Sequence, residues 1–376
     1  MLSVTKTRGV VCHWLCRCFL RNERRLFGTG RACGTHRESG ICRYAKQLPD
    51  RTPVAFGTRH GRDTGVVSEQ FLGLLSLLLG CLLAGCSSAT EDPSEPRALS
   101  SKGVVTAYVV NYPLKFFTER IGGEHVKVGF PVPPDEDPAF WRPDADAIAS
   151  YQEADLILLN GASYAKWTPT VSLPASRLVD TSAPFRDKYI EIQDAVRHSH
   201  GPGSEHAHIG TAFTTWLDPT LAIAQADAIR AALAELRPQH TDTFQRNFAS
   251  LKSELNELDR KIAELVVDNI DRLLIFSHPV YQYFIRRFDL KAQTVHWEPD
   301  AVPSASMWED FQELLEDHPA NCMIWEAEPS TEIVTQLRQR GVESMVFDPC
   351  GNVPRSGDYM QVMQRNVDNM ARVFDR

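Results

Sequence analysis

Four histidines within a short segment are the first residues in this sequence whose types and spacing could do chemistry. His198 and His200 form one His-x-His pair, and His206 and His208 form a second, in "HSHGPGSEHAHIGTAFTTWLDP". Neutral imidazole is a good ligand for zinc, copper or nickel. The glycines and the proline between the pairs predict a flexible loop over residues 198–208. The segment is therefore either part of a metal site or a solvent-exposed accessory chelator.

Single polar residues that follow apolar runs are the next candidates. His278 follows "LLIF", Asp348 follows "MVF", and Glu326 and Glu328 end the run "NCMIW". Each has a plain structural alternative: a histidine bonded to backbone at a strand end, an Asp-Pro turn, and a solvated strand end. Two carboxylates so close together could bind a cation, and we expect Glu328 rather than Glu326 to line the cleft.

Acidic and aromatic residues elsewhere are weaker candidates for a metal or ligand site. The run from Asp135 to Asp137 is typical of a solvated surface. Trp141, Trp216 and Trp297 either line the base of a cleft or pack in the core. His296 is a further, weaker candidate for a ligand. The sequence contains no HExxH, no G-x-S-x-G elbow and no P-loop. We therefore do not expect an enzyme.

The bulk composition is that of a globular chain with an unusual beginning. The protein has 376 residues, 43% hydrophobic and 23% charged, which predicts two domains or one large one. The first 65 residues are basic, whereas the net charge of the whole chain is −8, so the remainder is strongly acidic. An acidic body disfavours a nucleic-acid partner and suits a protein that handles cations.

Only two of the nine cysteines, Cys322 and Cys350, belong to this acidic body. Two cysteines do not make a disulfide framework. If the strands beside them are parallel neighbours, the two thiols are about 15–20 Å apart at ~3.3 Å per residue, too far to bridge. We predict that they do not form a disulfide.

The apolar run over residues 70–85 has the length of a signal-peptide core and is too short to span a bilayer. Its end, "LAGC", resembles the bacterial lipobox, in which the cysteine becomes the lipid-bearing first residue. We therefore expect a lipoprotein signal peptide over residues 66–85, lipidation of Cys86, and a Ser/Pro-rich tether over residues 86–102.

Residues 1–65 are expected to lie outside the mature protein, with the true start near Val66. A zinc-binding cysteine cluster in this region is the alternative, but its spacings lack the paired CxxC of a structural zinc site.

The rest of the chain alternates apolar strands with helices. We predict an N-terminal α/β lobe over residues 103–237, a connecting helix over residues 238–267, and a C-terminal α/β lobe over residues 268–376. The strands are apolar on both faces, which predicts mostly parallel sheets with flanking helices. From Thr241 to Val267, apolar residues recur at three- and four-residue steps, which predicts one long helix of roughly 40 Å.

Several pieces of the chain, in order from about residue 103 to the end, resemble the zinc/manganese ABC-transporter substrate-binding proteins (cluster A-I, TroA-like). They are "YPL", "VPPDEDP", "EADLILLNG", "WLDP", "SHPVYQYFIRRFDL", "EPDAVPS" and "FDPCG". In that family, four side chains hold one divalent metal between the lobes. The resemblance places those four positions at Ala139, Thr214, His278 and Asp348.

Half of the ligand set that the resemblance implies is absent here, since alanine cannot ligate and threonine is a poor zinc ligand. The resemblance therefore implies His278 and Asp348 as ligands, with Glu328 beside them. In the family, a His-rich loop is an accessory, a role that His198 and His200 would fill. His206 or His208 could instead fold back beside Thr214 and replace a missing ligand.

The function implied is an extracytoplasmic lipoprotein that captures a divalent metal for an ABC importer, with Zn2+ the expected cargo and Mn2+ second. Its partners would be an ABC permease and, through the anchor at Cys86, a membrane. It would be a monomer in the bacterial periplasm or on the cell surface. The alternative is a diverged relative that binds another ligand, such as a metal chelate or an anion, or a surface metal buffer.

Overall fold

The computed structural model describes residues 103–199 and 205–374, and it describes residues 193–199 and 205–209 as backbone only. The expectations for residues 1–102, including lipidation of Cys86, and for His200 lie outside the described residues. Within the described ranges, no helix is long and apolar enough to cross a membrane. The described residues belong to one compact unit, residues 91–376.

The first sheet has four parallel strands in the order β2-β1-β3-β4. Its strands are β1 (Val105–Val109), β2 (Val126–Gly129), β3 (Leu156–Leu159) and β4 (Leu178–Asp180). The helices of this half are α2 (Tyr112–Gly122), α3 (Ala145–Glu153) and α4 (Pro219–Leu236). Each strand coincides with an apolar run of the sequence, and each of these helices begins after an Asn or Asp side chain that caps it.

The second sheet also has four parallel strands, in the order β10-β9-β7-β8. Its strands are β7 (Leu273–Phe276), β8 (Lys291–Thr294), β9 (Cys322–Trp325) and β10 (Glu343–Val346). The helices of this half are α6 (Gln282–Phe288), α7 (Ala305–Asp317), α8 (Thr331–Gln339) and α9 (Tyr359–Phe374). The predicted α/β class with two mostly parallel sheets is confirmed.

Both sheets follow the same winding rule. In each, the second strand lies on one side of the first and the third lies on the other, so the direction of winding changes between β1 and β3 and between β7 and β9. In open α/β sheets, such a switch point leaves a crevice at the carboxyl ends of the strands, where ligands bind. Two crevices, one in each lobe, are therefore dictated by topology alone.

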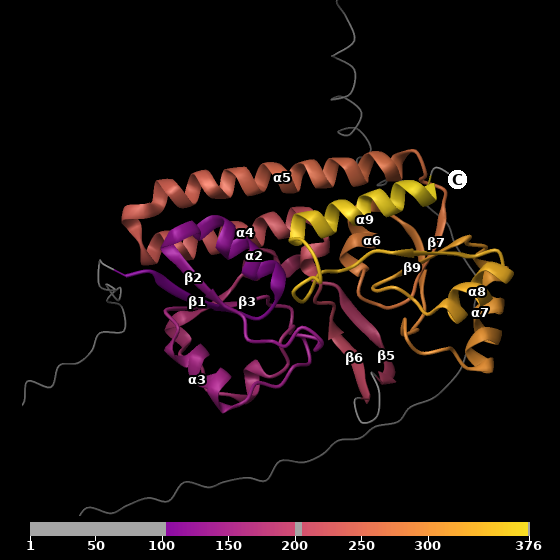
Figure 1. The fold of residues 1–376 in the computed structure, drawn as a ribbon, viewed down its shortest axis with the longest axis horizontal. Helices are drawn as coiled ribbons and strands as arrows, with labels where there is room; N and C mark the ends of the chain where they lie inside the picture. The colour runs from indigo at the N-terminus through magenta and orange to yellow at the C-terminus, as the bar shows by residue number, and fades with distance from the viewer. Residues whose placement is uncertain (1–102, 200–204, 375–376) are drawn as a thin grey trace, which may run out of the picture. The chain divides into compact units, whose positions relative to one another are not determined.

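The long helix α5 (Thr241–Val267) has the bounds that the sequence predicted. Its buried face, which includes Phe244, Leu251 and Leu258, packs against α2 and α4 at one end and against α6 and α9 toward the other. Figure 1 shows α5 running along both α4 and α9. One continuous apolar core extends from Val105 to Phe374 and takes side chains from both halves. The helix is therefore a shared wall of the core.

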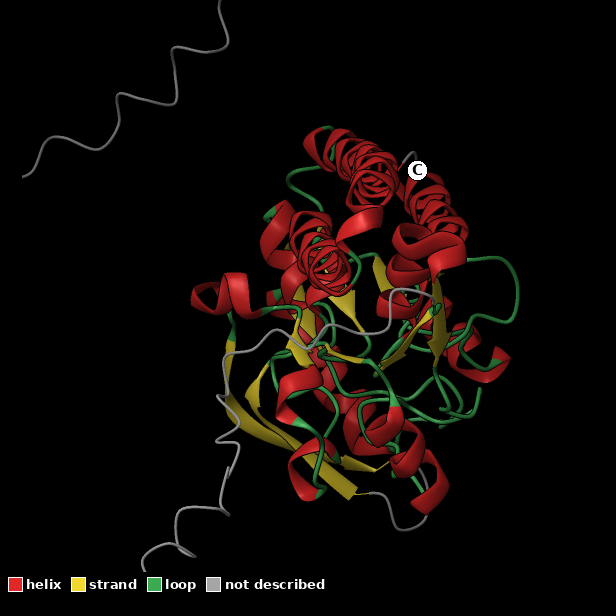
Figure 2. Ribbon diagram, turned by 90° about the vertical axis from the view of Figure 1, so that its left-hand side faces the viewer, coloured by secondary structure: helices red, strands yellow, loops and turns green. Residues whose placement is uncertain are grey.

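A β-hairpin occupies the segment for which the sequence predicted a flexible loop. It consists of β5 (Glu191–Ser199) and β6 (Glu205–Thr211), which pair antiparallel with His198 opposite His206. Figure 2 shows the two strands side by side up to the tip. The pairing passes through an irregularity between Ile192 and Val196. Such a bulge breaks the regular apolar alternation from which a strand is normally predicted.

Cys322 begins β9, and Cys350 lies four residues after the end of β10. The two strands pair in parallel, which was the condition on which the absence of a disulfide was predicted. Both thiols are buried and free.

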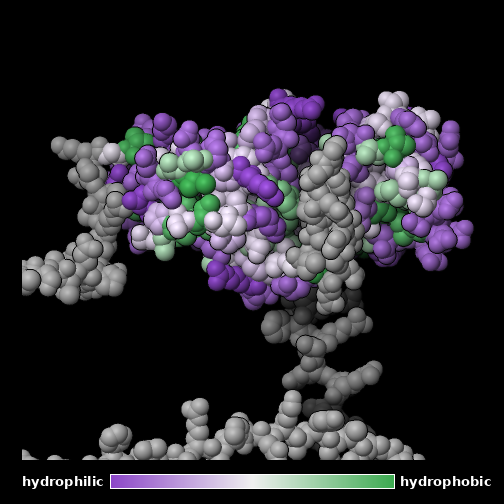
Figure 3. Space-filling view, turned by 90° about the horizontal axis from the view of Figure 1, so that it is seen from below, coloured by the Kyte–Doolittle hydropathy of each residue, from purple (hydrophilic) through white to green (hydrophobic). Residues whose placement is uncertain are grey.

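On the face drawn in Figure 3, the visible surface is mostly hydrophilic, and its hydrophobic residues form small separate groups.

Candidate metal centre

Three side chains that could bind a cation follow three neighbouring strands of the second sheet. His278 comes two residues after β7, Glu326 comes directly after β9, and Glu298 comes four residues after β8. In the sheet, β7 lies between β9 and β8, so the histidine stands between the two carboxylates. The three residues therefore meet at the carboxyl edge of this sheet, at its switch point.

The backbone on either side of His278 is held by both neighbouring strands. The Ser277 N–H donates to the Ile324 carbonyl in β9 (2.8 Å), and the Ser277 carbonyl accepts from the Trp297 N–H beyond β8 (2.8 Å). These bonds continue the ladders past the ends of the assigned strands. The backbone that leads into His278 is thus held by sheet hydrogen bonds.

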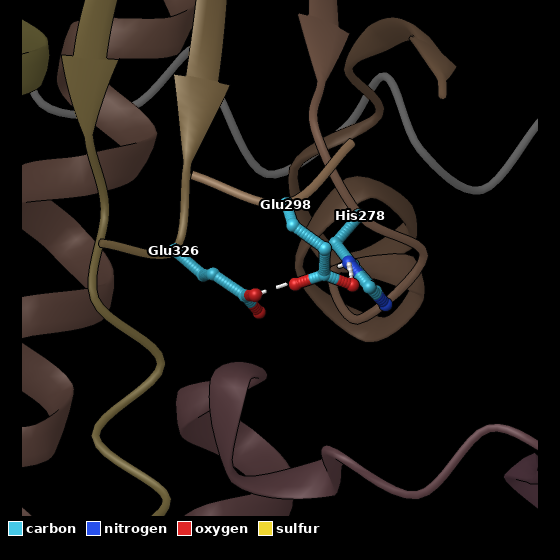
Figure 4. Close-up of side chains that lie close together, drawn as sticks. All are labelled: His278, Glu298 and Glu326. Atoms are coloured by element: carbon cyan, nitrogen blue, oxygen red, sulfur yellow. Dashed lines mark ion pairs between the residues drawn. The ribbon is translucent and has the colours of Figure 1, made fainter. Parts of the chain in front are cut away.

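The donor atoms of the cluster lie close together. His278 Nδ1 is 3.7 Å from Glu298 Oε1 and 3.8 Å from Glu326 Oε1, and the three donor atoms all lie within 4.8 Å of one another. Figure 4 shows the three side chains converging. Four ligand atoms about 2.1 Å from a zinc ion lie about 3.4 Å from one another. The two separations that involve His278 therefore lie within a few tenths of an ångström of the edge of a tetrahedral site.

The cluster is shielded but reachable. The His278 side chain is 2% exposed, that of Glu298 is 16% exposed and that of Glu326 is 25% exposed. His278 and Glu326 line a cavity of about 310 Å³ between the two halves of the molecule. A cation that enters this cavity meets the imidazole and a carboxylate at once.

The opposite wall of the cavity comes from the first half and is largely aromatic. Its aromatic residues are Phe140, Tyr164, Phe213 and Trp216. Tyr164 packs edge-on against Phe213 and Trp216, with ring centroids 5.3 Å and 5.5 Å away. Burial raises the pKa of the Tyr164 phenol well above its usual value. This wall therefore presents neutral rings to whatever the acidic cluster binds.

Neither position at which the resemblance implied a lost ligand supplies one here. Ala139 is fully buried and does not line the cavity, although Asp137 and Phe140 on either side of it do. Thr214 lines the cavity, but its hydroxyl donates to the Val280 carbonyl in the other half. Thr214 therefore joins the two halves.

Asp348, which the sequence placed among the ligands, lies outside the three-residue cluster. Its Oδ1 accepts the Cys350 N–H at 2.7 Å. Asn366 holds the backbone of Asp348 from both sides, at 3.0 and 2.8 Å. Burial raises the pKa of this carboxyl group. The Asp-Pro turn, which was the alternative, is what the structure contains.

The expectation that Glu328 rather than Glu326 lines the cleft is wrong. Glu328 is exposed and lies in a separate depression beside Arg338 and Glu343, whereas Glu326 faces the cavity. Sequence reasoning missed Glu298 altogether. It considered His296 instead, whose ring centroid is 6.1 Å from that of His278 and whose pKa is lowered by burial. The signal for Glu298 was its place just beyond the strand next to the one that carries His278.

The tryptophans divide between the cavity and the core. Trp216 lines the cavity and donates its indole N–H to the Pro349 carbonyl at 2.7 Å. Trp141 and Trp297 are buried in the two cores. Core packing was the better interpretation for these two.

The hairpin carries His206 and His208 along an extended strand. At about 3.3 Å per residue, these positions are about 17 and 10 Å along β6 from Thr211. A strand that folded back toward Thr214 would have to give up its pairing with β5. The paired strand therefore argues against His206 or His208 as the replacement for a lost ligand.

Two parallel sheets with a cavity between them, and a cluster of cation-binding donors on one wall, define a two-lobed binding protein. The family ZnuA, described as zinc-uptake complex component A periplasmic, matches residues 107–373, and this chain belongs to that family.

Individual relatives are distant. The chain is 24% identical over 321 residues to the zinc-binding lipoprotein AdcA of Streptococcus pneumoniae strain R6, covering 81% of this chain and 60% of AdcA. It is 23% identical over 305 residues to the high-affinity zinc uptake system protein ZnuA of Bacillus subtilis, covering 76% of this chain and 92% of that protein. The chain thus spans less than two thirds of the length of AdcA.

Solved structures show the same fold. The Zn(II)-bound ZnuA-like domain of Streptococcus pneumoniae AdcA superimposes with a TM-score of 0.62 at 21% identity, over 73% of this chain and all of that domain. The lipoprotein YcdH of Bacillus subtilis superimposes with a TM-score of 0.62 at 20% identity, over 72% of this chain and 98% of that one.

Proposed function

We propose that this protein captures a divalent metal outside the cytoplasm and passes it to the permease of an ABC importer, with no bond made or broken. The observation that carries the proposal is the cluster of His278, Glu298 and Glu326, in which the His278 nitrogen lies 3.7 and 3.8 Å from the two carboxylate oxygens, close to the spacing of zinc ligands. Membership of the zinc-uptake family supports the same function.

Zinc is the metal that this donor set favours. One neutral imidazole and two carboxylates give Zn2+ three protein ligands and cancel its charge, and they leave the fourth position open toward the cavity. For any one set of N and O donors, Zn2+ binds more tightly than Mn2+ in the usual order of divalent metals. Manganese should therefore be the weaker cargo.

Metal titration of the purified protein tests this proposal. The protein is stripped by dialysis against a chelator, and zinc binding is followed by calorimetry. His278→Ala should abolish tight binding. His240→Ala is the matched control, because His240 stacks on His125 and does not line the cavity. Absence of tight zinc binding in the unaltered protein would overturn the proposal.

The His-rich hairpin is proposed as an accessory that raises the local concentration of metal near the cavity. Its four imidazoles, at His198, His200, His206 and His208, suit weak and exchangeable zinc binding. Alanine at all four positions should slow zinc capture from dilute solution and leave the tight stoichiometric site intact. Loss of the tight site in that variant would instead make the hairpin part of the main centre.

The cellular setting is proposed from the sequence. We place a signal peptide at residues 66–85, a lipid on Cys86 and a tether at residues 86–102, with the protein as a monomer on a bacterial membrane, facing the periplasm or the outside. The division into residues 103–237, 238–267 and 268–376 is proposed on the same basis. Cys86→Ala should move the protein from the membrane fraction to the soluble extracytoplasmic fraction.

A further inference from the structure

We infer that the cavity takes the metal together with a small, flat, neutral nitrogen-donor chelator rather than as a bare ion. This inference rests on the proposed function, because it concerns the form in which the same centre receives its cargo. Three observations carry it: the size of the cavity, the placement of the donors, and the charge of the lining.

The cavity is much larger than a metal ion needs. Its volume is about 310 Å³. A water molecule occupies roughly 30 Å³, so a zinc ion with one water in its open position would fill only a small part of it. Pockets for small organic molecules begin at about 300 Å³ and are mostly apolar, with a few polar groups that fix orientation. This cavity meets that description.

The donors of the cluster all lie on one wall. His278, Glu298 and Glu326 come from the second half of the molecule, whereas the first half supplies the aromatic wall. The hydroxyl of Thr214, on that wall, is already bonded to the Val280 carbonyl. The open side of a bound metal therefore faces four aromatic rings, with the carboxylates of Glu136 and Asp137 on the same wall. Two nitrogen donors of a small flat molecule could bind the metal there and make it five-coordinate, while the rings of that molecule pack on the aromatic wall.

The charge of the lining selects against an anionic chelator. Glu136, Asp137 and Glu326 line the cavity, and none of the described residues that line it is a lysine or an arginine. Zinc in a neutral chelator would bring two positive charges to Glu298 and Glu326. Zinc in a polycarboxylate would bring net negative charge into a cavity lined with carboxylates, which is repulsive. A neutral nitrogen-donor chelator satisfies both the rings and the charges.

The test compares three forms of zinc by calorimetry on the full-length protein stripped of metal: hydrated Zn2+, the equimolar Zn2+–bipyridine complex, and Zn2+–EDTA. Zn2+–bipyridine should bind about 10-fold more tightly than hydrated Zn2+, and Zn2+–EDTA should not bind. Bipyridine should also elute with the protein in gel filtration, where its ultraviolet absorbance reports it.

Phe140→Leu should reduce the tenfold preference for the bipyridine complex over hydrated zinc to less than threefold. Phe130→Leu is the matched control, because Phe130 is a half-buried phenylalanine that does not line the cavity. The inference would be overturned if bipyridine only competes with the protein for zinc. It would also be overturned if the preference for the bipyridine complex persists in Phe140→Leu. Either result would leave the proposed function intact. If neither hydrated zinc nor its bipyridine complex binds, both the inference and the proposed function are overturned. Binding of Zn2+–EDTA would overturn the argument from charge.

Discussion

The carboxyl edges of the two sheets are alike in topology and opposite in chemistry. In the second sheet, the residues that follow the strands are a histidine and two glutamates, and they line or adjoin a cavity. In the first sheet, Asn111 follows β1, Asn160 follows β3 and Thr181 follows β4, and all three are buried. Strand order fixes where a crevice forms, and residue type decides whether it binds a ligand or is closed by the protein itself.

The edge of the first sheet is closed by a network of amide groups. Asn160 Oδ1 accepts from Asn111 Nδ2 (3.0 Å) and from Gln225 Nε2 (3.1 Å), and Asn160 Nδ2 donates to the Phe213 carbonyl (2.9 Å). Gln225 also donates to Thr181 Oγ1 at 3.0 Å. A buried network with its groups paired in this way makes the structure rigid. This one holds the loop that carries Phe213 and Thr214 to the cavity.

His278→Ala tests the second edge and should have the largest effect. The variant removes the only nitrogen donor of the cluster, so the Kd for zinc should rise about 1,000-fold, which corresponds to about 4 kcal/mol. Calorimetry measures the Kd, and circular dichroism checks that the protein remains folded. An unchanged Kd would place the metal elsewhere and break the comparison between the two edges.

Asn160→Ala tests the first edge, where the effect should be on stability. The substitution leaves the Asn111 and Gln225 amides and the Phe213 carbonyl without this partner, which should lower the free energy of unfolding by about 3 kcal/mol. Urea denaturation measures that change. Zinc binding by the folded variant should weaken less than threefold, and a larger loss would mean that the first edge takes part in binding.

Glu298→Gln sharpens the second edge, because the sequence alone did not identify this residue. Loss of one of the two negative charges should raise the Kd for zinc about 10-fold, or about 1.4 kcal/mol. Glu328→Gln is the matched control, since Glu328 is an exposed glutamate in a separate depression. Equal effects of the two substitutions on calorimetric affinity would mean that only the general negative potential matters.

Asp348→Asn should have the smallest effect. An amide oxygen can still accept the Cys350 N–H, so zinc affinity should change less than threefold. Because burial raises the pKa of Asp348, its ionisation costs folding free energy once the pH rises through that pKa. The variant should therefore be as stable as the original at neutral pH, or more stable, by urea denaturation. A large loss of zinc affinity would restore Asp348 as a ligand.

The sequence predicted the elements better than the centre. Apolar runs identified the strands of both sheets, and the apolar stripe from Phe244 to Leu265 identified α5, because burial leaves a periodic pattern in the residues themselves. The sequence did not predict the hairpin, because glycine, proline and histidine near its tip are typical of a loop. The irregularity after Ile192 also interrupts the alternation that would indicate a strand.

For the centre, the sequence predicted His278, but the carboxylates that it favoured, Glu328 and Asp348, are not those of the cluster. Glu326 and Glu328 are two residues apart, and only the path of the chain after Trp325 decides which of them turns inward. Glu298 lies beyond β8, and its approach to His278 depends on β8 being the neighbour of β7, which is a property of sheet order. Asp348 has its side chain oxygen on a turn N–H, which no pattern of residue types reveals.

The last helix has a consequence for how the chain reaches its native state. Tyr359 at the start of α9 packs against Phe117 of α2, with ring centroids 5.2 Å apart, and the 16 residues of α9 help to close a core that begins at Val105. The core that the N-terminal half shares therefore cannot close until α9 has been synthesised. Because side chains from both halves share one core, we expect the protein to unfold in a single cooperative transition.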